Sequence, residues 1–231
     1  MKMPERVETG IPGLDKLMES GLVKGSVTLV SGGAGTGKTI FCSQFINHGL
    51  QKGENCLYIT LEESPENIKE DVKNFGWDFE EFVSRKKLFL EYRDPFQMTD
   101  IVTPLVERIE GQKIRRVVID STSLLGLYFK NAFEIRKQLY KLVMALKATG
   151  ATSVLTAEIS DDSGNKLSRF GVEEFVADGV IKLYGMKIGE GNFRSLQIIK
   201  MRRTKHAEDV FPFEFGKNGI AVKSKESVFK T

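Results

Sequence analysis

The stretch "GGAGTGKT", from Gly32 to Thr39, has the residue types and the spacing needed to bind phosphate groups. Its glycines let the backbone turn N–H groups inward around phosphate oxygens without the clashes that a Cβ atom would cause. The amino group of Lys38 can reach the β- and γ-phosphates of a nucleotide, and the hydroxyl of Thr39 can bind Mg²⁺. The pattern therefore predicts a site for ATP and Mg²⁺ that is formed by Gly32, Gly33, Ala34, Gly35, Thr36, Gly37, Lys38, Thr39 and Ile40.

A carboxylate for the metal side of this site follows a second apolar run. "RRVVID" ends in Asp120, and buried parallel strands have such continuous apolar sequences. Asp120 is therefore expected at the same sheet edge as the phosphate loop, where it would hold Mg²⁺ through a water molecule, because magnesium keeps part of its hydration shell.

Two adjacent carboxylates, Glu62 and Glu63, follow the apolar run "CLYITL". ATP hydrolysis needs a group that positions or deprotonates the attacking water, and a strand end beside the phosphate loop would place one there. Side chains alternate along an extended strand, so we expect only one glutamate to face the nucleotide directly. The alternation does not say which of the two it is.

The elements that must position these residues alternate between β-branched runs and amphipathic stretches. We predict strands over 26–32, 56–61, 115–121 and 152–158, and helices over 39–50 and 133–149. Ser64 is expected to cap a further helix whose first residue is Pro65. This alternation predicts an α/β fold with a mostly parallel twisted sheet flanked by helices, which binds ligands at the carboxyl ends of its strands.

The alternation of predicted strands and helices ends after Gly164. "GVEEFVADGVIKLYGMK" and "FRSLQIIKMRRT" both have strand-like sequences, and the turn-rich "IGEGN" joins them. We therefore expect antiparallel strands added to the C-terminal edge of the parallel core.

Length and composition favour one domain over residues 1–231 in a reducing compartment. The net charge is only +3, so the overall charge does not indicate nucleic acid or a membrane surface as a partner. Cys42 and Cys56 have no spacing suited to zinc and are expected to be buried thiols. The first ten residues contain no apolar signal region, and no apolar stretch is long enough to span a membrane. These features predict a cytoplasmic protein.

The sequence resembles the KaiC-like branch of the RecA-type ATPases along nearly its whole length. The resemblance lies in "VETGIPGLDKLMESGLVKGSVTLVSGGAGTGKT", "YITLEESPENI", "RRVVIDSTS", "RFGVEEFVADGVIKL" and "IIKMRRTKH". It implies a RecA-like phosphate-loop domain that assembles into a homo-oligomeric ring, commonly a hexamer, with ATP between the subunits.

The resemblance also implies roles for individual residues. Glu62 matches the general base and Glu63 a supporting carboxylate. Lys200 and Arg202 match residues that reach the neighbouring subunit's phosphates, and Arg194 and His206 match further interface or nucleotide contacts. A cation supplied by the neighbour would stabilise the charge on the transferring phosphoryl group.

Other features leave alternatives open. The cluster "KMRRTKH" could also be a solvated face or a nucleic-acid contact, since clustered Lys and Arg bind phosphates. The loop 161–169 carries as many acids as bases, which argues against DNA strand exchange. Phe96, Phe129 and Phe133 are interpreted as core or subunit contacts, and Thr156 and Glu158 as either γ-phosphate sensors or a plain strand end.

Three functions therefore compete. The first is an Mg²⁺-dependent ATPase ring with a regulatory or signalling role and an unidentified protein partner. The second is a DNA recombination or repair ATPase, and the third is a nucleotide-gated assembly protein in which turnover is incidental. The two glutamates beside a phosphate loop favour the first.

Overall fold

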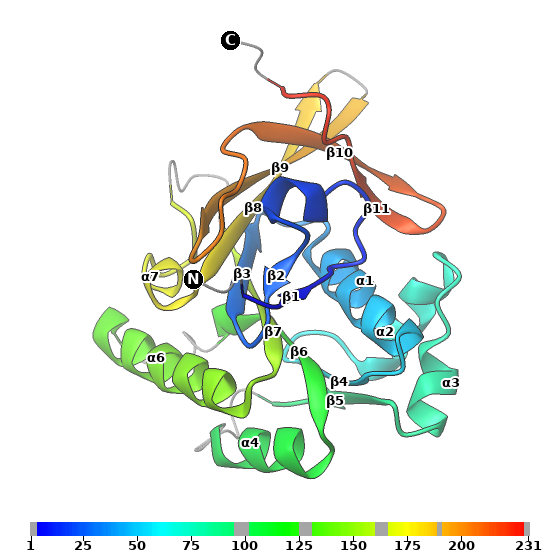
Figure 1. Ribbon diagram of the computed structural model, residues 1–231, viewed down its shortest axis with the longest axis vertical. Coiled ribbons are helices and arrows are strands. Elements are labelled where there is room, and N and C mark those ends of the chain that lie inside the picture. Colours follow the sequence, from blue (N-terminus) through cyan, green and yellow to red (C-terminus); the bar gives the residue numbers. More distant parts are fainter. Residues whose placement is uncertain (1–3, 95–101, 125–130, 160–165, 189–190, 229–231) are drawn as a thin grey trace.

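Helices cover both faces of one large β-sheet in the computed structural model shown in Figure 1. The structure describes residues 4–94, 102–124, 131–159, 166–188 and 191–228. The strands are β1 (Arg6–Val7), β2 (Leu22–Val23), β3 (Val27–Gly32), β4 (Asn55–Thr60), β5 (Leu88–Tyr92), β6 (Ile114–Asp120), β7 (Thr152–Glu158), β8 (Gly179–Ile188), β9 (Gly191–Met201), β10 (Val210–Gly216) and β11 (Gly219–Val222). The α-helices are α1 (Lys38–Gln51), α2 (Pro65–Lys73), α3 (Phe79–Ser84), α4 (Val102–Gly111), α6 (Ala132–Thr149) and α7 (Glu173–Val176), and short 3-10 helices span Asp15–Met18 and Thr122–Leu124.

The strand order in the described sheet is β11-β10-β9-β8-β3-β7-β6-β4-β5. The six strands from β8 to β5 are mutually parallel, whereas β9, β10 and β11 pair antiparallel. This confirms the predicted α/β fold with antiparallel strands at the C-terminal edge. The antiparallel part begins at β9, because β8 itself runs parallel to β3.

The two faces of the sheet are packed by different helices. On one face, Phe41, Phe45 and Ile46 of α1 pack in a cluster with sheet residues such as Tyr58 and Val118. On the other face, a second cluster contains the buried sides of α4 and α6 together with alternate sheet residues. Both predicted helical stripes are confirmed, since α6 buries Leu139, Leu142, Val143 and Leu146.

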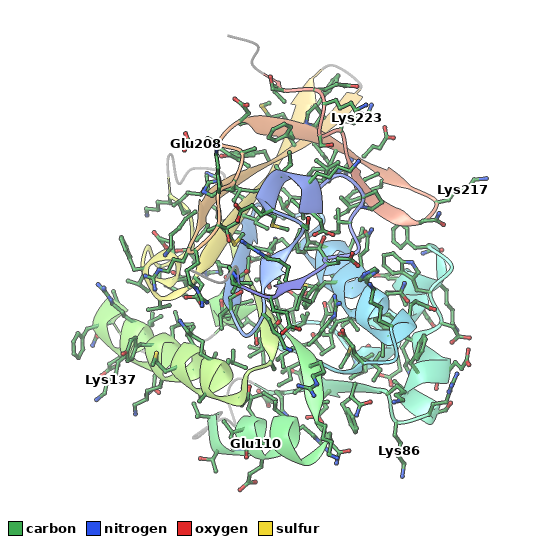
Figure 2. All side chains as sticks on the ribbon, viewed as in Figure 1. Lys86, Glu110, Lys137, Glu208, Lys217 and Lys223 are labelled. Carbon is green, nitrogen blue, oxygen red and sulfur yellow. The ribbon has the colours of Figure 1, made fainter. Side chains whose placement is uncertain are left out.

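Local sequence explains where α6 begins and ends. The Asn131 side chain accepts a hydrogen bond of 2.9 Å from the N–H of Glu134, which caps the first turn. The helix ends at Thr149, and Gly150 follows with a φ of +73°, a left-handed conformation that favours glycine. The exposed side of α6 carries charged residues together with Phe133, Tyr140 and Met144, and Figure 2 shows Lys137 pointing away from the body of the molecule.

The prediction of a strand over "GVEEFVADGVIKLYGMK" was wrong in its first part. Residues Glu173–Val176 form the short helix α7, and the strand begins at Gly179. The hydroxyl of Ser168 hydrogen-bonds the carboxylates of Glu173 and Glu174, and the N–H of Val172 donates to Glu173. These contacts fix a turn where the sequence pattern alone indicates an extended chain.

Further sequence predictions concern three phenylalanines, the polar loop, the two cysteines and membrane-spanning segments. Phe133 is 74% exposed, so it does not belong to the core of this chain. Phe96, Phe129 and residues 161–165 of the polar loop lie outside the described residues. Cys42 and Cys56 are free and buried, as predicted, and burial raises the pKa of both thiols. None of the helices in the described part of the chain combines the length and the apolar composition needed to cross a bilayer.

The packing of α6 yields a test of the fold. Leu139 is 1% exposed, and replacing it with alanine removes buried contacts and leaves a cavity. Leu139→Ala should therefore lower the free energy of unfolding by about 2–5 kcal/mol. The matched control is Lys141→Ala on the exposed side of the same helix, which should change it by less than about 0.5 kcal/mol. Urea denaturation measures both, and equal losses would contradict the assignment of the buried face.

Candidate nucleotide site

The phosphate loop joins the end of β3 to the start of α1. Gly35 and Gly37 have φ angles of +68° and +100°, which side-chain-bearing residues rarely adopt. At Gly32 a Cβ atom would lie 2.6 Å from Thr36 Oγ1 and 2.8 Å from the carbonyl oxygen of Leu183. The loop therefore requires its glycines, and it opens onto the N-terminus of a helix of 14 residues. The unpaired N–H groups and the helix dipole at that end favour an anion.

The ammonium group of Lys38 is turned back onto this loop. Its Nζ donates hydrogen bonds to the carbonyl oxygens of Gly32 at 3.1 Å and Gly33 at 2.9 Å. It also lies 3.9 Å from Oε1 of Glu158. The side chain is only 9% exposed, so this buried cation is compensated by the loop itself and by one carboxylate.

The carboxylate of Asp120 accepts hydrogen bonds from three side-chain hydroxyls. Its Oδ2 accepts hydrogen bonds of 2.9 Å from both Thr39 Oγ1 and the Tyr58 hydroxyl. Its Oδ1 accepts one of 2.5 Å from Thr156 Oγ1. These three hydroxyls come from α1, β4 and β7, so four neighbouring elements fix the orientation of one carboxylate.

The oxygen atoms of Thr39 and Asp120 fit a magnesium ion. Mg²⁺ prefers oxygen ligands and is usually bound by one or two protein groups together with substrate phosphates and water. A threonine hydroxyl and a carboxylate in direct contact beside a phosphate loop supply that set. These two residues would therefore hold the ion.

The two glutamates follow β4, whose last residue, Thr60, pairs with Asp120 in the parallel ladder. The chain bends there, because Thr60 Oγ1 accepts the N–H groups of Glu62 and Glu63 and donates to the Glu63 carbonyl. The alternation of an extended strand therefore does not apply to the pair. Contrary to the expectation that only one would face the nucleotide, both line the same cavity.

The environment of each glutamate favours its protonated form. Burial raises the pKa of Glu62, and the charges of Glu158 and Asp120 raise it further. A hydrogen bond of 2.6 Å from Ser121 Oγ to Glu62 Oε1 and the charge of Lys38 act in the opposite direction. For Glu63, burial again raises the pKa first, followed by the charges of Asp120, Asp71 and Glu62.

Lys38, Thr39, Asp120 and the two glutamates line one cavity of about 310 Å³. Its polar end is lined by phosphate-loop residues, by both glutamates and by Asp120 and Glu158. Its apolar end lies toward α2 and the C-terminal strands, where the lining side chains are Ile68, Val72, Phe75, Trp77 and Phe215. A cavity with a charged end for phosphates and an aromatic end has the character of a nucleotide site.

Sequence reasoning missed Tyr58, Ser121 and the apolar lining. A signal for Tyr58 was present, because it lies two residues before Thr60 in β4 and so points to the same face of the sheet. Thr156, interpreted as a sensor or a plain strand end, contacts Asp120 instead. The apolar lining had no local signal, since it combines residues 68–77 with Phe215.

The residues matched to contacts with a neighbouring subunit lie in two separate places. Lys200 and Arg202 lie at the end of β9, where Met201 pairs with Gly179. The phosphate loop lies beside Leu183, four residues or about 13 Å further along β8. These two cations are therefore at the opposite end of the sheet from their own chain's cavity.

Lys200 and Arg202 are held together by the segment that precedes β8. Lys200 Nζ donates to the carbonyl oxygens of Glu174 at 2.9 Å and Ala177 at 2.8 Å. The Arg202 guanidinium lies 3.7 Å from Asp178 Oδ1, although β9 itself ends at Met201. His206 lies beyond them, between β9 and β10, with Nδ1 2.9 Å from the Ala207 carbonyl oxygen.

Arg194 lies near the cavity of its own chain. It pairs with Gly185 on the phosphate-loop side of β8, and its guanidinium carbon is 4.5 Å from the centroid of the Phe215 ring. Phe215 lines the cavity, and its ring would be 2.6 Å from a Cβ atom at Gly37. Arg194 is thus separated from the cations with which the sequence grouped it.

Comparison with known proteins also indicates a nucleotide site, because the matching family is an ATPase family. Residues 7–227 match the family described as "ATPase: KaiC". The chain is 34% identical over 230 residues to the circadian clock protein KaiC3 of Synechocystis sp., covering 94% of this chain and 45% of that protein. It is 35% identical over 228 residues to the circadian clock oscillator protein KaiC of Synechococcus elongatus, covering 94% and 44%. The chain thus spans just under half the length of these relatives.

A solved structure covers both molecules almost completely. The crystal structure of the KaiC-like protein PH0186 from Pyrococcus horikoshii superposes with a TM-score of 0.86 and 38% sequence identity, covering 95% of this chain and 99% of that one. Together with the family match over residues 7–227, this establishes that the chain belongs to the KaiC family of phosphate-loop ATPases, with the RecA-like fold.

Proposed function

We propose that this protein hydrolyses ATP with Mg²⁺ in a homo-oligomeric ring, which we expect to be a hexamer. The observation that supports this most is the convergence of the phosphate loop, the Thr39–Asp120 contact and two glutamates on one cavity. Binding alone would require the loop and the metal ligands but not the carboxylates beside them. The glutamates favour turnover.

The loop residues bind and orient the triphosphate. The N–H groups of the loop and of the first turn of α1 receive phosphate oxygens, and Lys38 exchanges the carbonyls of Gly32 and Gly33 for the β- and γ-phosphates. Thr39 and Asp120 hold the Mg²⁺, which when bound neutralises charge on the phosphate oxygens. Phe215 lines the same cavity, and the Arg194 guanidinium lies over its ring.

Glu62 positions the attacking water and accepts its proton. Ser121 fixes the orientation of the Glu62 carboxylate through the 2.6 Å hydrogen bond. A glutamate whose pKa is raised above that of an exposed carboxyl is a better proton acceptor near neutral pH. Glu63 is the next residue and lines the same cavity.

Lys200 and Arg202, at the far end of the sheet, act on the nucleotide bound by the next subunit. Lys200 and Arg202 lie about 13 Å along the sheet from their own phosphate loop, so they do not act there. In a closed ring one end of each subunit meets a different surface of its neighbour. A neighbour's cavity is therefore the place where these cations can stabilise a transferring phosphoryl group.

We place the ring in the cytoplasm and assign it a regulatory role toward a protein partner. Two buried, free cysteines suit a reducing compartment. The similarity to circadian clock proteins supports regulation rather than metabolism.

The two glutamates have distinguishable effects on turnover. Glu62→Gln keeps the shape but removes the proton acceptor, so kcat should fall by about 10²–10⁴-fold with little change in ATP affinity. Glu63→Gln should lower it less. The control is Glu66→Gln on α2, whose side chain is 72% exposed. Phosphate release measures all three, and a Glu62→Gln protein with the parent rate would show that Glu62 is not the base.

The pH dependence follows from the direction of the Glu62 pKa. The base must be deprotonated, and burial raises its pKa above the ordinary value of 4.5. The rate should therefore fall as the pH is lowered through a value above 4.5. Ser121→Ala removes the hydrogen bond that lowers this pKa, so the acid limb of kcat/KM should move to higher pH. A shift to lower pH would contradict the role of Ser121.

Mixed rings test the contribution of the neighbour. Lys38→Ala damages the cavity and Arg202→Ala removes the neighbour's cation, so each pure variant should be inactive. In a random one-to-one mixture, about a quarter of interfaces combine an intact cavity with an intact cation, and activity should recover to about that share. The control mixes Lys38→Ala with the variant that carries both Lys38→Ala and Arg202→Ala. It should recover no activity, because no subunit has an intact cavity. If the first mixture also stays inactive, Arg202 does not act across the interface.

A further inference from the structure

Glu158 at the end of β7 lies between two cations. Its Oε1 is 3.9 Å from Lys38 Nζ, and its Oε2 is 3.9 Å from the Arg169 guanidinium. The side chain is 37% exposed and lines the cavity beside the phosphate loop. One carboxylate is thus shared between the lysine of the loop and an arginine outside it.

The backbone beneath this carboxylate is fixed. Glu158 pairs with Gly32 in the β3–β7 ladder, and its N–H donates a 2.7 Å hydrogen bond to Ser123 Oγ. The next residue, Ile159, donates its N–H to the Gly32 carbonyl at 3.1 Å. The Glu158 side chain can therefore change partners while its main chain stays attached to the phosphate loop.

The arginine on the other side is also anchored. Arg169 follows Ser168, which is fully buried and hydrogen-bonded to Glu173 and Glu174 of α7. The N–H of Phe170 donates to Glu173 at 3.4 Å. Arg169 is therefore a second cation at a set place, on the segment that leads into α7.

Nucleotide binding changes how strongly Lys38 and Arg169 each attract the Glu158 carboxylate. Lys38 can neutralise either the Glu158 carboxylate or a phosphate oxygen, and a γ-phosphate would add negative charge next to that carboxylate. Like charges that close repel, whereas Arg169 attracts the displaced carboxylate. A bound diphosphate lacks the γ-phosphate and leaves the Lys38–Glu158 contact less disturbed.

We propose that Glu158 is a positioning residue that sets the preference of this site between ADP and ATP. It holds Lys38 while no γ-phosphate is present, and it turns to Arg169 when a γ-phosphate takes its place. Glu158 thereby opposes ATP more than ADP, and Arg169 reduces that opposition. The inference rests on the proposed ATP site and adds to it the residues that discriminate between the two nucleotides.

The test is a binding cycle on the whole protein. Isothermal titration calorimetry with Mg²⁺ measures ADP and the non-hydrolysable ATP analogue adenylyl imidodiphosphate on the parent, Glu158→Gln, Arg169→Gln and the double variant. Glu158→Gln should tighten binding of the analogue by about tenfold, a typical size for coupling between two groups, and binding of ADP by clearly less. Arg169→Gln should weaken binding of the analogue. In the Glu158→Gln background the same change should have no effect, because Arg169 acts through Glu158.

The outcomes separate this inference from the proposed function. A parent that binds neither nucleotide overturns both. A parent that binds both nucleotides, with an unchanged affinity ratio in Glu158→Gln, overturns the role of Glu158 alone. An Arg169→Gln effect that persists in the Glu158→Gln background shows that Arg169 contacts nucleotide directly, which also contradicts the proposal. Glu158→Ala serves as a second variant, with thermal melting to confirm that each protein is folded.

Discussion

The parallel register of four strands is the constraint on which the site depends. Gly32 pairs with Glu158 and Thr60 pairs with Asp120, so β3, β7, β6 and β4 end at the same edge of the sheet. A shift of one residue in any ladder would turn these side chains to the other face. The hydrogen bond from Thr39 to Asp120 then joins the start of α1 to the end of β6. The phosphate loop, Asp120 and the two glutamates lie together because the backbone pairing places their strand ends at one edge.

The same sheet separates two groups of charged residues. The cavity lies at the carboxyl ends of the parallel strands, whereas Lys200 and Arg202 lie at the opposite end of β8 and β9. Lys200 is bound there by carbonyl oxygens at the end of α7, and α7 is anchored through Ser168 next to Arg169. The segment beside Glu158 is therefore continuous with the one that positions the cations proposed to act on a neighbour. This gives a physical route by which one site could affect the next.

The features that local chemistry determines could be predicted from the sequence. The Ser64 cap and the apolar stripe of α6 are confirmed, because each depends on residues close together in the chain. The positions of Asp120 and of the glutamate pair followed from strand ends that share one edge. Features that depend on distant contacts could not be predicted. The helix at Glu173 needs Ser168, the bend at Glu62 needs the Thr60 hydroxyl, and the place of Arg194 needs Phe215.

Replacement of Asp120 is the sharpest test of the proposed ATPase, because its carboxylate is hydrogen-bonded to side chains of α1, β4 and β7. Asp120→Asn keeps the side-chain shape but removes the negative charge that would hold Mg²⁺. Phosphate release should be measured at saturating MgATP on the parent and the variant, with thermal melting to confirm folding. We expect turnover by the parent and a loss of about 10²-fold or more in the variant. Equal rates in the two proteins, or no phosphate release by the parent, would contradict it.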